Sequence, residues 1–597
     1  MTLYVGEATA VASAPPVFPP FGTPFREPSG VPDPDGEYVA FRARTSAGLG
    51  REELAAALAG PGTWVYDTSP AEFDGDLVGF AATALTGLPD AVVGVGPPRR
   101  WGRVGESFRS ACRAVESACA LGLRGVHSVA SLGLSSVVVA DRDVGEALCH
   151  RYLDPLPAGE AVVDTVRAYF ASGMRVSRAA RRLFLHPNTV RYRLSCFERL
   201  TGARLGDVGD AMEVWWALRY AEAVGTGSRP PVARDAEVLR RRVEDEVRAR
   251  GPEAALLTDP RCAGGLATLV SALARAASGA HELGADEVRL AAVGVAWARR
   301  GHPVAELAAV CRSVVRGVVR IRLEPVADRR SEAVQRDVEA AVRRCNALVA
   351  VLLGAHGGAD RVPAPEQFLR ALLLGPRDDT LPRDAVHFGL DPDAAYRAVH
   401  GRPEPGGDPR LLARAHGLRV DGGSADGMAA VVGSEVIGFV PAGVEPAAGA
   451  GTGVLGLGPA RPIHRVAESF RMATRALDTA VRLGRTGVQD FTGLGSLPAL
   501  WAADHAVHTA LTGKYLAPLG QGEQAARIAD TVYAYLLAGR NVQRAARRLV
   551  VHPNTVHHRV GRFERLVGVD LRAATPEVFE VLWTLRRRRA DWADIPG

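Results

Sequence analysis

The sequence predicts a multidomain α+β protein in which a mixed α/β domain followed by a mainly α domain occurs twice. The main observation is an internal repeat, because residues 164–202 and 530–568 align without a gap and share 24 of 39 positions. Strand-like and helix-like patterns alternate before each repeat, and the stretch between the two units has almost only helical patterns. We therefore expect two α/β domains, two mainly α domains and one helical bundle.

The first α/β domain is expected over residues 36–157, where apolar or β-branched runs indicate strands and amphipathic runs indicate helices. In chain order we expect strand 38–41, helix 52–58, strands 64–66, 77–80 and 91–94, helix 106–121 and a strand near Val126. A related domain is expected over 366–520. There VAESFR at 466–471 matches VGESFR at 104–109, and GLGP at 456–459 matches GVGP at 94–97.

Two other regions lie outside the repeat. Residues 1–35 are rich in proline and poor in aliphatic residues, which favours a disordered tail. Residues 232–356 contain long helical patterns and are expected to form a helical bundle, with linkers near 226–231 and 357–365.

The mainly α domains are expected over residues 158–225 and 521–590, and the repeated segment within them has the pattern of a helix-turn-helix. In the first copy a helix over 164–171 ends before Gly173, and a short helix over 176–183 comes next. His186 then stands at an N-cap position. Pro187 stands at the first helical position, where a missing N–H costs nothing.

The long helix that begins at Pro187 has one narrow apolar stripe. Its members are Val190, Leu194, Phe197 and Leu200, and the second copy keeps Val556, Val560, Phe563 and Leu566. A stripe this narrow leaves the opposite face free to enter the major groove of DNA, N-terminal end first.

The other positions of the motif carry side chains that suit such a face. An asparagine such as Asn188 can pair bidentately with adenine, and the arginine pair that ends the preceding helix would lie where a phosphate backbone passes. The candidate DNA-binding residues are Arg181, Arg182, His186, Asn188, Thr189, Arg191, Tyr192 and Arg193 in the first copy, and Arg547, Arg548, His552, Asn554, Thr555, His557, His558 and Arg559 in the second.

The placement of charge supports this interpretation. Lys514 is the single lysine, and the many arginines, alanines and glycines indicate GC-rich coding as in actinobacteria, so arginine content alone is not informative. The first repeat has eight arginines against two acids, a charge of +6, and the second has seven against two, a charge of +5. Because the whole chain carries only +6, everything outside the repeats sums to about −5. Positive charge is thus concentrated in the two units, as in DNA-binding domains.

At these residues the chain resembles the C-terminal helix-turn-helix of the PucR/CdaR family of bacterial transcription regulators, itself similar to the Fis-type motif. Both copies meet the family's run xAxxLxxHxNTxxxRLxxxExLTG almost throughout. The resemblance implies a sequence-specific DNA-binding regulator with effector-responsive, non-catalytic domains. The second copy departs from the first, with His557-His558 in place of Arg191-Tyr192 and Gly561 in place of Ser195. The two copies would therefore prefer different half-sites, or the second would bind more weakly.

The same family implies that the two α/β domains are degenerate GGDEF-like domains and that the helical middle is a sensory domain. Cyclase chemistry needs a Gly-Gly turn followed by carboxylates that hold metal and triphosphate. Residues 72–76 (EFDGD) lack the glycine pair, residues 431–435 (VVGSE) keep one glycine and one carboxylate, and Gly422-Gly423 is followed by Ser424-Ala425. We expect no catalytic residues and no cofactor.

The GxGxxG match at 451–456 precedes prolines, which favours a loop and a strand end over a dinucleotide site.

Cysteine spacing and hydropathy point to the same class of protein. The seven cysteines are scattered and never spaced as CxxC, which argues against a disulfide framework and a structural zinc site. No apolar run reaches the ~18 residues of a membrane helix, and the first thirty residues do not resemble a secretory signal. We expect a cytoplasmic protein that binds no metal and no membrane.

The favoured interpretation is a DNA-binding transcription regulator with double-stranded DNA as its partner and a small-molecule effector as a further partner. The duplicated motif would contact two half-sites, either as an intramolecular pseudo-dimer or within a homodimer. The alternative is a protein-interaction scaffold that docks partners through its helix-turn-helix units. A third hypothesis, an enzyme of nucleotide metabolism, is disfavoured by the missing carboxylates.

Overall fold

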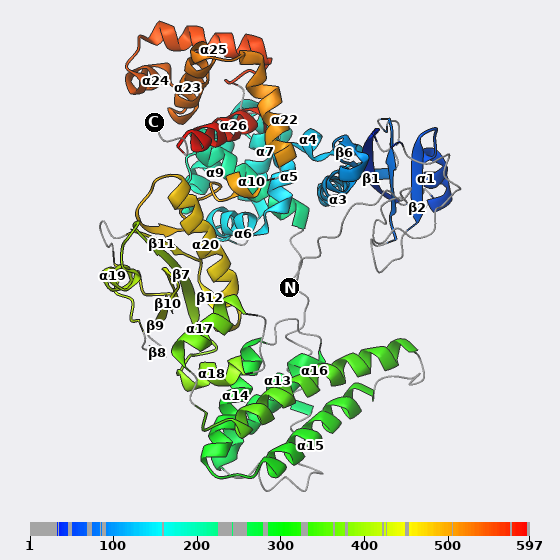
Figure 1. Ribbon diagram of the computed structural model, residues 1–597, viewed down its shortest axis with the longest axis vertical. Helices are drawn as coiled ribbons and strands as arrows, with labels where there is room; N and C mark the ends of the chain where they lie inside the picture. Colours follow the sequence, from blue (N-terminus) through cyan, green and yellow to red (C-terminus); the bar gives the residue numbers. More distant parts are fainter. Residues whose placement is uncertain are drawn as a thin grey trace, which may run out of the picture. The chain divides into compact units, whose positions relative to one another are not determined.

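A computed structural model gives the fold of the chain (Figure 1). It describes residues 33–593 apart from 34, 46–49, 68–74, 84, 86–90, 158–159, 225–240, 243–259, 279–283, 324–331, 362–363, 376–379, 421–422, 425–426, 448–452, 504 and 573–575. The expected tail (1–35) and linker (226–231) therefore lie almost wholly outside the described residues. The chain divides into two compact units, Met1–Thr226 with Ala499–Ile595 and Gly227–Pro498 with Pro596–Gly597.

The first unit begins with a mixed sheet whose strand order is β2-β3-β1-β4-β6, with β5 paired to β1. The central strand β1 runs antiparallel to β3 and β4, whereas β4 and β6 are parallel. Helix α3 packs along β1 and β4, and helix α1 closes a core around Phe41 and Leu54. The elements are β1 (Glu37–Thr45), α1 (Arg51–Leu58), β2 (Thr63–Asp67), β3 (Leu77–Ala81), β4 (Ala91–Val95), β5 (Arg99–Arg100), η1 (Trp101–Arg103), α3 (Val104–Ala120) and β6 (Gly125–Ser128). Every strand and helix expected between 38 and 126 is present.

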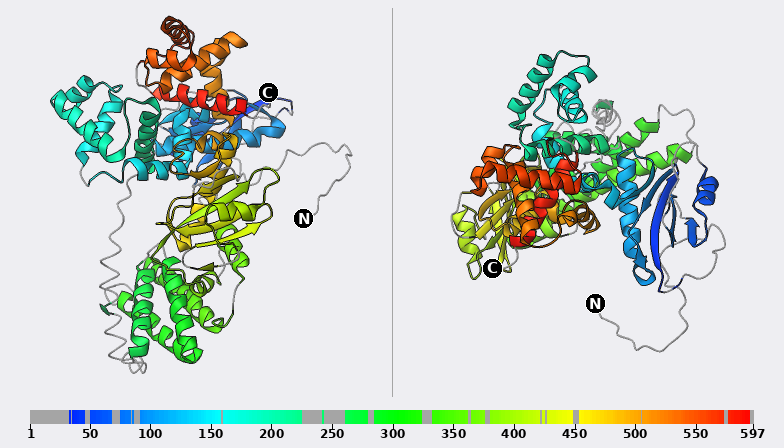
Figure 2. Two further views of the ribbon diagram at one scale, coloured as in Figure 1. Left: turned by 90° about the vertical axis from the view of Figure 1, so that its left-hand side faces the viewer. Right: turned by 90° about the horizontal axis from the view of Figure 1, so that it is seen from above.

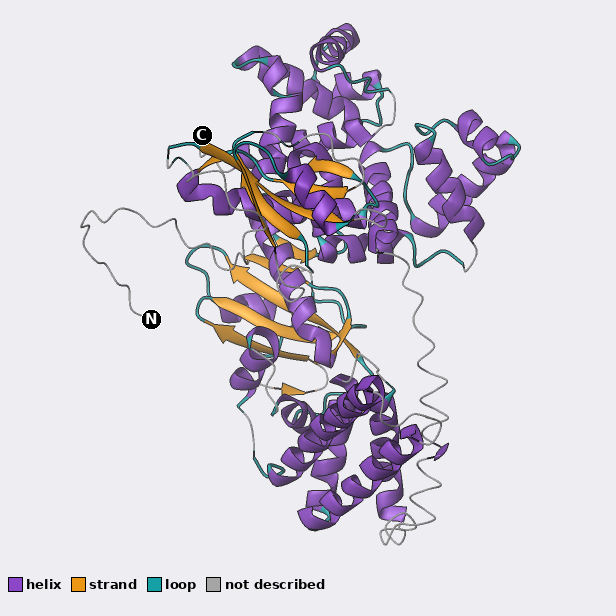
Figure 3. Cartoon of the chain, turned by 90° about the vertical axis from the view of Figure 1, so that its right-hand side faces the viewer, coloured by secondary structure: helices purple, strands orange, loops and turns teal. Residues whose placement is uncertain are grey.

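The second unit contains a related sheet, ordered β13-β11-β7-β10-β9-β8, with β12 paired to β7 and helix α20 packed on β7 and β11. Figure 3 shows both sheets in orange. The elements are α17 (Pro365–Leu374), α18 (Leu381–His387), β7 (Ala395–Pro403), α19 (Pro409–Ala415), β8 (Gly423–Ser424), β9 (Gly427–Val432), β10 (Glu435–Pro441), β11 (Gly453–Leu457), β12 (Arg461–Pro462), η2 (Ile463–Arg465), α20 (Val466–Arg482) and β13 (Gly487–Asp490). The described end of the GxGxxG run, Gly453–Gly456, is strand β11.

A shared serine explains why the two α/β domains have the same helix–sheet packing. The backbone N–H of Ala40 donates to Ser107 Oγ, and that of Ala398 donates to Ser469 Oγ, both at 2.9 Å. The second glycine of each GxGP motif lies against the same helix. A Cβ on Gly96 would fall 1.9 Å from the Ser107 carbonyl oxygen, and one on Gly458 would fall 2.0 Å from that of Ser469. Only glycine lets helix and strand approach this closely.

The described residues of the helical middle include four long helices, α13 (Pro260–Ala277), α14 (Gly284–Arg299), α15 (Val304–Leu323) and α16 (Glu332–Gly357). Their core is built from alanine, leucine and valine with Trp297. Helix α14 also contacts α18 and η2, so the bundle, green in Figure 2, packs against the yellow sheet domain of the same unit.

Short helices connect each sheet domain to the helix-turn-helix domain after it. They are α4 (Val129–Leu132), α5 (Leu134–Ala140) and α6 (Arg142–Tyr152) in the first copy, and α21 (Ala499–Ala502), α22 (His505–Tyr515) and η3 (Ala517–Leu519) in the second. Residues 499–520, expected with the second α/β domain, belong to the first unit, because α22 packs on α4 and α26 there.

The cysteines whose side chains are described, all but Cys262, are free thiols. Burial, with help from neighbouring carboxylates, raises the pKa of Cys149 to about 12, and burial raises that of Cys311 to about 12. These two thiols therefore stay protonated and unreactive at neutral pH.

Candidate nucleic-acid interface

Each helix-turn-helix domain contains four helices among its described residues, and the second and third of them form the helix-turn-helix. The first helix-turn-helix domain contains α7 (Glu160–Ala171), α8 (Val176–Arg182), α9 (Pro187–Thr201) and α10 (Val208–Val224). The second contains α23 (Glu523–Leu537), α24 (Val542–Leu549), α25 (Pro553–Val567) and α26 (Pro576–Ala593). Gly173 comes after α7 with φ +65°, as its predicted role in ending that helix requires.

The N-terminus of each long helix is built as the sequence predicts. His186 is the N-cap of α9, with Pro187 at the first position, and its Nδ1 accepts a hydrogen bond from the Asn188 backbone N–H at 3.2 Å. His552 does the same for Asn554, also at 3.2 Å. These imidazoles satisfy one of the helix's otherwise unpaired N–H groups, and they hold the adjacent asparagine at the exposed tip of the helix.

The apolar stripe is one residue shorter than predicted. Val190, Leu194 and Phe197 are buried, as are their counterparts in α25. Leu200 and Leu566, by contrast, are 46% and 44% exposed, so their assignment to the stripe is wrong. The physical reason is that both helices end within two residues, at Gly202 and Gly568 in the left-handed region, so these leucines lie in the last turn.

The exposed face of α9 carries a linked polar pair. Arg191 Nη1 donates to Asn188 Oδ1 at 2.8 Å, and Tyr192 lies beside them in solvent. In α25 the exposed positions are Asn554, His557 and His558. Thr189 and Thr555 are half-buried in the first turn, and the arginine pairs 181–182 and 547–548 are exposed at the ends of α8 and α24. The structure thus gathers cationic and amide groups at one end of each long helix.

Arg193 and Arg559 differ from the other candidates because they point into their own domains. Arg193 Nη1 donates to Thr165 Oγ1 of α7 at 3.2 Å, and Arg559 Nη1 donates to Thr531 Oγ1 of α23 at 3.1 Å. Both guanidiniums therefore tie the long helix to the first helix of the domain.

The turn between the two helices holds residues that the sequence did not single out. Phe184 and Val550 occupy equivalent positions, both with φ +54°, and are 96% and 90% exposed. A left-handed conformation costs a residue with a Cβ about 1–2 kcal/mol, and exposing a large apolar side chain brings no compensation within the chain. Such outliers indicate a functional surface. The sequence could have revealed this surface, because both copies have a large apolar residue at the same position of the turn.

One carboxylate at an equivalent hairpin of each sheet is held by neighbouring basic side chains. Asp76 accepts from Arg42 Nε at 2.7 Å and from Arg44 Nε at 3.0 Å. At the equivalent place in the second sheet, Glu435 accepts from Arg402 Nε at 2.8 Å and lies 2.9 Å from His400 Nε2. Within the described part of the chain, no group of three or more His, Cys, Asp or Glu side chains is arranged to hold a metal ion.

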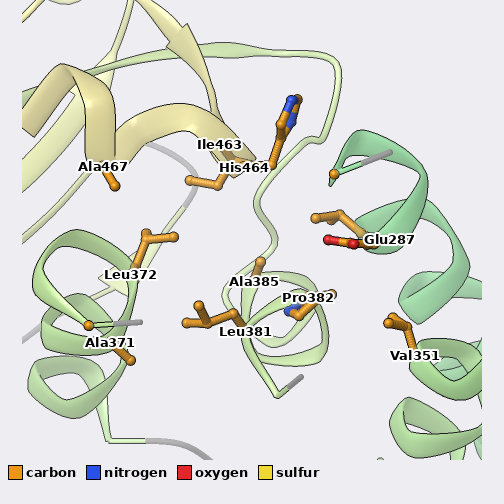
Figure 4. Close-up of a pocket in the computed structure, with 13 residues that line it drawn as sticks. Glu287, Val351, Ala371, Leu372, Leu381, Pro382, Ala385, Ile463, His464 and Ala467 are labelled. Atoms are coloured by element: carbon orange, nitrogen blue, oxygen red, sulfur yellow. The ribbon is translucent and has the colours of Figure 1, made fainter. Parts of the chain in front are cut away.

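The second unit contains a small cavity that could hold a ligand. It has a volume of about 150 Å³ and is lined by α14, α17, α18 and η2 (Figure 4). Leu372, Leu381 and Ile463 make its apolar wall, and the carboxylate of Glu287 points into it. None of the described residues supplies a hydrogen-bond partner to that carboxylate.

A short helix, an αL turn and a capped helix with an exposed polar tip define a helix-turn-helix domain, and this chain has two. Both are PucR C-terminal helix-turn-helix domains, since the model of that family matches residues 162–220 and 528–586. The expected resemblance is thereby confirmed for these two domains.

Three curated proteins are similar to part of the chain. Uncharacterized proteins of Mycobacterium tuberculosis (strains H37Rv and CDC 1551) and Mycobacterium bovis are 31% identical to it over 220 residues, which cover 35% of this chain and 50% of each relative. The chain thus spans about half the length of the curated relatives it matches. A crystal structure of a regulator of polyketide synthase expression from Bifidobacterium adolescentis is 17% identical, with 38% of this chain and 98% of that chain covered and a TM-score of 0.18.

Among the described helices, none is both long enough and apolar enough to cross a membrane.

Proposed function

We propose that this protein is a sequence-specific DNA-binding transcription regulator that acts in the cytoplasm. The observation that carries the proposal is the duplicated helix tip, in which a His N-cap presents an asparagine at the exposed end of a basic helix. Asparagine and arginine read adenine and guanine edges in the major groove, and flanking arginines hold phosphates.

The proposed contacts fall into three kinds. Asn188 and Arg191 would read bases in one half-site, and Asn554 with His557 would read the other. The arginine pairs at the ends of α8 and α24, with Thr189 and Thr555, would hold the backbone. Phe184 and Val550 would pack on sugars or thymine methyl groups at the turn.

The direct test is DNA binding by the full chain to fragments that flank its own gene, at two salt concentrations. Wild type should bind with a steep salt dependence, because each phosphate contact adds about 0.9 to the slope of log K against log salt. The double substitution Asn188→Ala, Arg191→Ala should remove site preference. Arg370→Ala, an exposed arginine on α17, is the charge-matched control and should change nothing.

The scaffold alternative predicts the opposite result. A protein that docks partners through these helices would bind no fragment even at low salt, and both variants would then behave like wild type. That outcome would overturn the regulator proposal.

We further infer that the α/β domains are non-catalytic. Two arginines already donate to Asp76, and Arg402 donates to Glu435 with His400 beside it, so neither carboxylate is open to a metal–triphosphate complex. Incubation with magnesium and nucleoside triphosphates should give no turnover, and any cyclic nucleotide product would contradict this inference.

The cavity beside Glu287 is the proposed effector site. An apolar cavity of about 150 Å³ admits a benzene-sized group, and an unpartnered carboxylate favours a cationic substituent. The effector class is therefore a small aromatic or branched amine. Benzylamine should raise the unfolding temperature of wild type but not of Glu287→Gln, whereas phenylacetate should have no effect. Equal stabilisation of the two proteins would rule out this site.

A further inference from the structure

The last helices of the two helix-turn-helix domains are equivalent to each other, although the loop before the second is one residue longer. Five residues of α10 recur in α26 at the same spacing, Glu213/Glu580, Val214/Val581, Trp216/Trp583, Leu218/Leu585 and Arg219/Arg586. The pairs define which residues of the two domains correspond in space.

The same local contacts hold both helices in place. The Tyr152 hydroxyl donates to Glu213 at 3.0 Å, and the Tyr515 hydroxyl donates to Glu580. A cation joins each carboxylate, Arg151 at 3.7 Å in the first copy and Lys514 at 3.1 Å in the second. Burial raises the pKa of both tyrosines, so each hydroxyl keeps the proton that it donates.

The two helices contact each other through equivalent residues. The rings of Trp216 and Trp583 lie 5.5 Å apart between centroids, and both side chains are fully buried. A residue that contacts its own counterpart must lie on or near a two-fold axis. In a head-to-tail arrangement it would meet a different residue instead.

A second set of equivalent positions accompanies the tryptophan contact. Arg586 of α26 lies against Gly209 of α10, where a Cβ would come within 2.9 Å of its guanidinium. Their counterparts, Arg219 of α10 and Pro576 of α26, both line one hollow between the two helices. An isologous interface brings residue i near j and residue j near i in this way.

The seam, meaning the contact between α10 and α26, has an aromatic centre. Trp215 contacts Phe579 with ring centroids 5.6 Å apart, and Phe170 also reaches Phe579 at 6.3 Å. Across the described residues, neither indole N–H of Trp216 or Trp583 has a hydrogen-bond acceptor. The seam is therefore held by packing of large aromatic side chains, as in a permanent interface.

We propose that the two helix-turn-helix domains form a pseudo-two-fold pair within one chain, so that a single chain recognises two unlike half-sites in inverted orientation. The inference rests on the proposed function and decides between the pseudo-dimer and the homodimer. A two-fold relation turns one recognition helix to face the opposite strand from the other, which is the arrangement that an inverted repeat presents. The half-sites are unlike because α9 exposes Arg191 and Tyr192 where α25 exposes two histidines. Because the second copy already fills the seam, no second chain is needed.

The first arm of the test examines the seam without DNA, by hydrogen exchange of the full chain. Trp216→Ala should speed exchange in residues 576–593 by about tenfold or more, and Trp583→Ala should do the same in residues 208–224. The control Leu194→Ala removes a buried side chain of α9 away from the seam, and its effect should stay within the first domain. If each tryptophan variant changes only its own domain, the pairing is wrong.

The second arm examines DNA, with duplexes selected by the wild-type chain from a random pool. The enriched duplex should contain two unlike half-sites in inverted orientation and bind one chain, as measured by light scattering. Reversing one half-site in place should weaken binding about 100-fold, because the two contacts then no longer act together. Direct repeats, single half-sites or two chains per duplex would overturn the proposal. If no duplex is enriched, the proposed function fails and with it the DNA half of the inference, while exchange still decides the pairing.

Discussion

The two helix-turn-helix domains share their internal contacts and differ in the side chains that they expose. Glu198 accepts from the Leu205 backbone N–H at 2.8 Å, and Glu564 accepts from that of Leu571 at 3.0 Å. The arginine–threonine bonds between the first and third helices agree within 0.1 Å. Among the eight paired candidate positions, only Arg191/His557 and Tyr192/His558 differ. The comparison shows that the internal contacts of the domain are kept in both copies, while two exposed positions of the long helix differ.

The two sheet domains also share their internal contacts, but they differ at one buried position. Arg42 is buried on the first sheet, and the equivalent buried residue of the second sheet is His400. A guanidinium has five N–H donors, whereas an imidazole has only two ring nitrogens. The two domains should therefore respond differently when the partner carboxylate is neutralised.

The largest expected effect comes from neutralising that carboxylate in the first domain. Arg42 and Asp76 are 4% and 5% exposed, so Asp76→Asn leaves a buried cation without its closest partner and should cost about 3–5 kcal/mol. Glu435→Gln should cost about 1 kcal/mol or less, because the Glu435 side chain is 30% exposed. Urea unfolding followed by hydrogen exchange in β3 and β10 measures the two losses separately. Equal losses would show that burial of the cation is not the deciding difference.

The next effect concerns the recognition helices. Exchanging the two pairs, Arg191→His with Tyr192→His and His557→Arg with His558→Tyr, should exchange the preferred half-sites. Each altered base contact should change discrimination by about 1–3 kcal/mol. Selection of duplexes by the exchanged protein measures this directly, with the wild-type chain as control. An unchanged selected sequence would mean that these positions do not contact bases.

Local features of the helix-turn-helix could be predicted from the sequence, and tertiary ones could not. The His186 cap and Pro187 depend only on neighbours in the chain, and both are where they were expected. Leu200 was misplaced because its burial depends on whether another helix covers the last turn. The inward direction of Arg193 depends on Thr165, 28 residues away. The Trp216–Trp583 contact joins residues from the two copies, so no local pattern reveals it.

A smaller difference between the two domains is expected from Gly561. It stands in the interior of α25, where α9 has Ser195, and apart from the backbone of α25 itself no described neighbour lies within 4 Å of the place a Cβ would take. Gly561→Ala should therefore stabilise the second domain by about 0.5–1 kcal/mol, through a lower entropy of the unfolded chain. The matched change Ser195→Ala should have a smaller effect. Thermal unfolding of the two variants checks this, and a destabilised Gly561→Ala would mean that the helix needs glycine for close approach to a partner.

The smallest expected effect is a pH dependence confined to the second sheet. Burial acts to raise the pKa of Glu435, but hydrogen bonds from His400 and Arg402 outweigh it and hold that pKa below its ordinary value of 4.5. A carboxylate with a depressed pKa in the folded state stabilises the fold above its ordinary pKa, and this contribution is lost as pH falls through the folded value. Because Glu435 is partly exposed, the loss should be on the order of 0.5 kcal/mol. The protection factors of β9 and β10, which correct for the intrinsic pH dependence of exchange, should therefore fall below pH 4.5 in wild type. In Glu435→Gln the same strands should change with the intrinsic rate alone, and if they instead keep the wild-type pH dependence, another carboxylate is responsible.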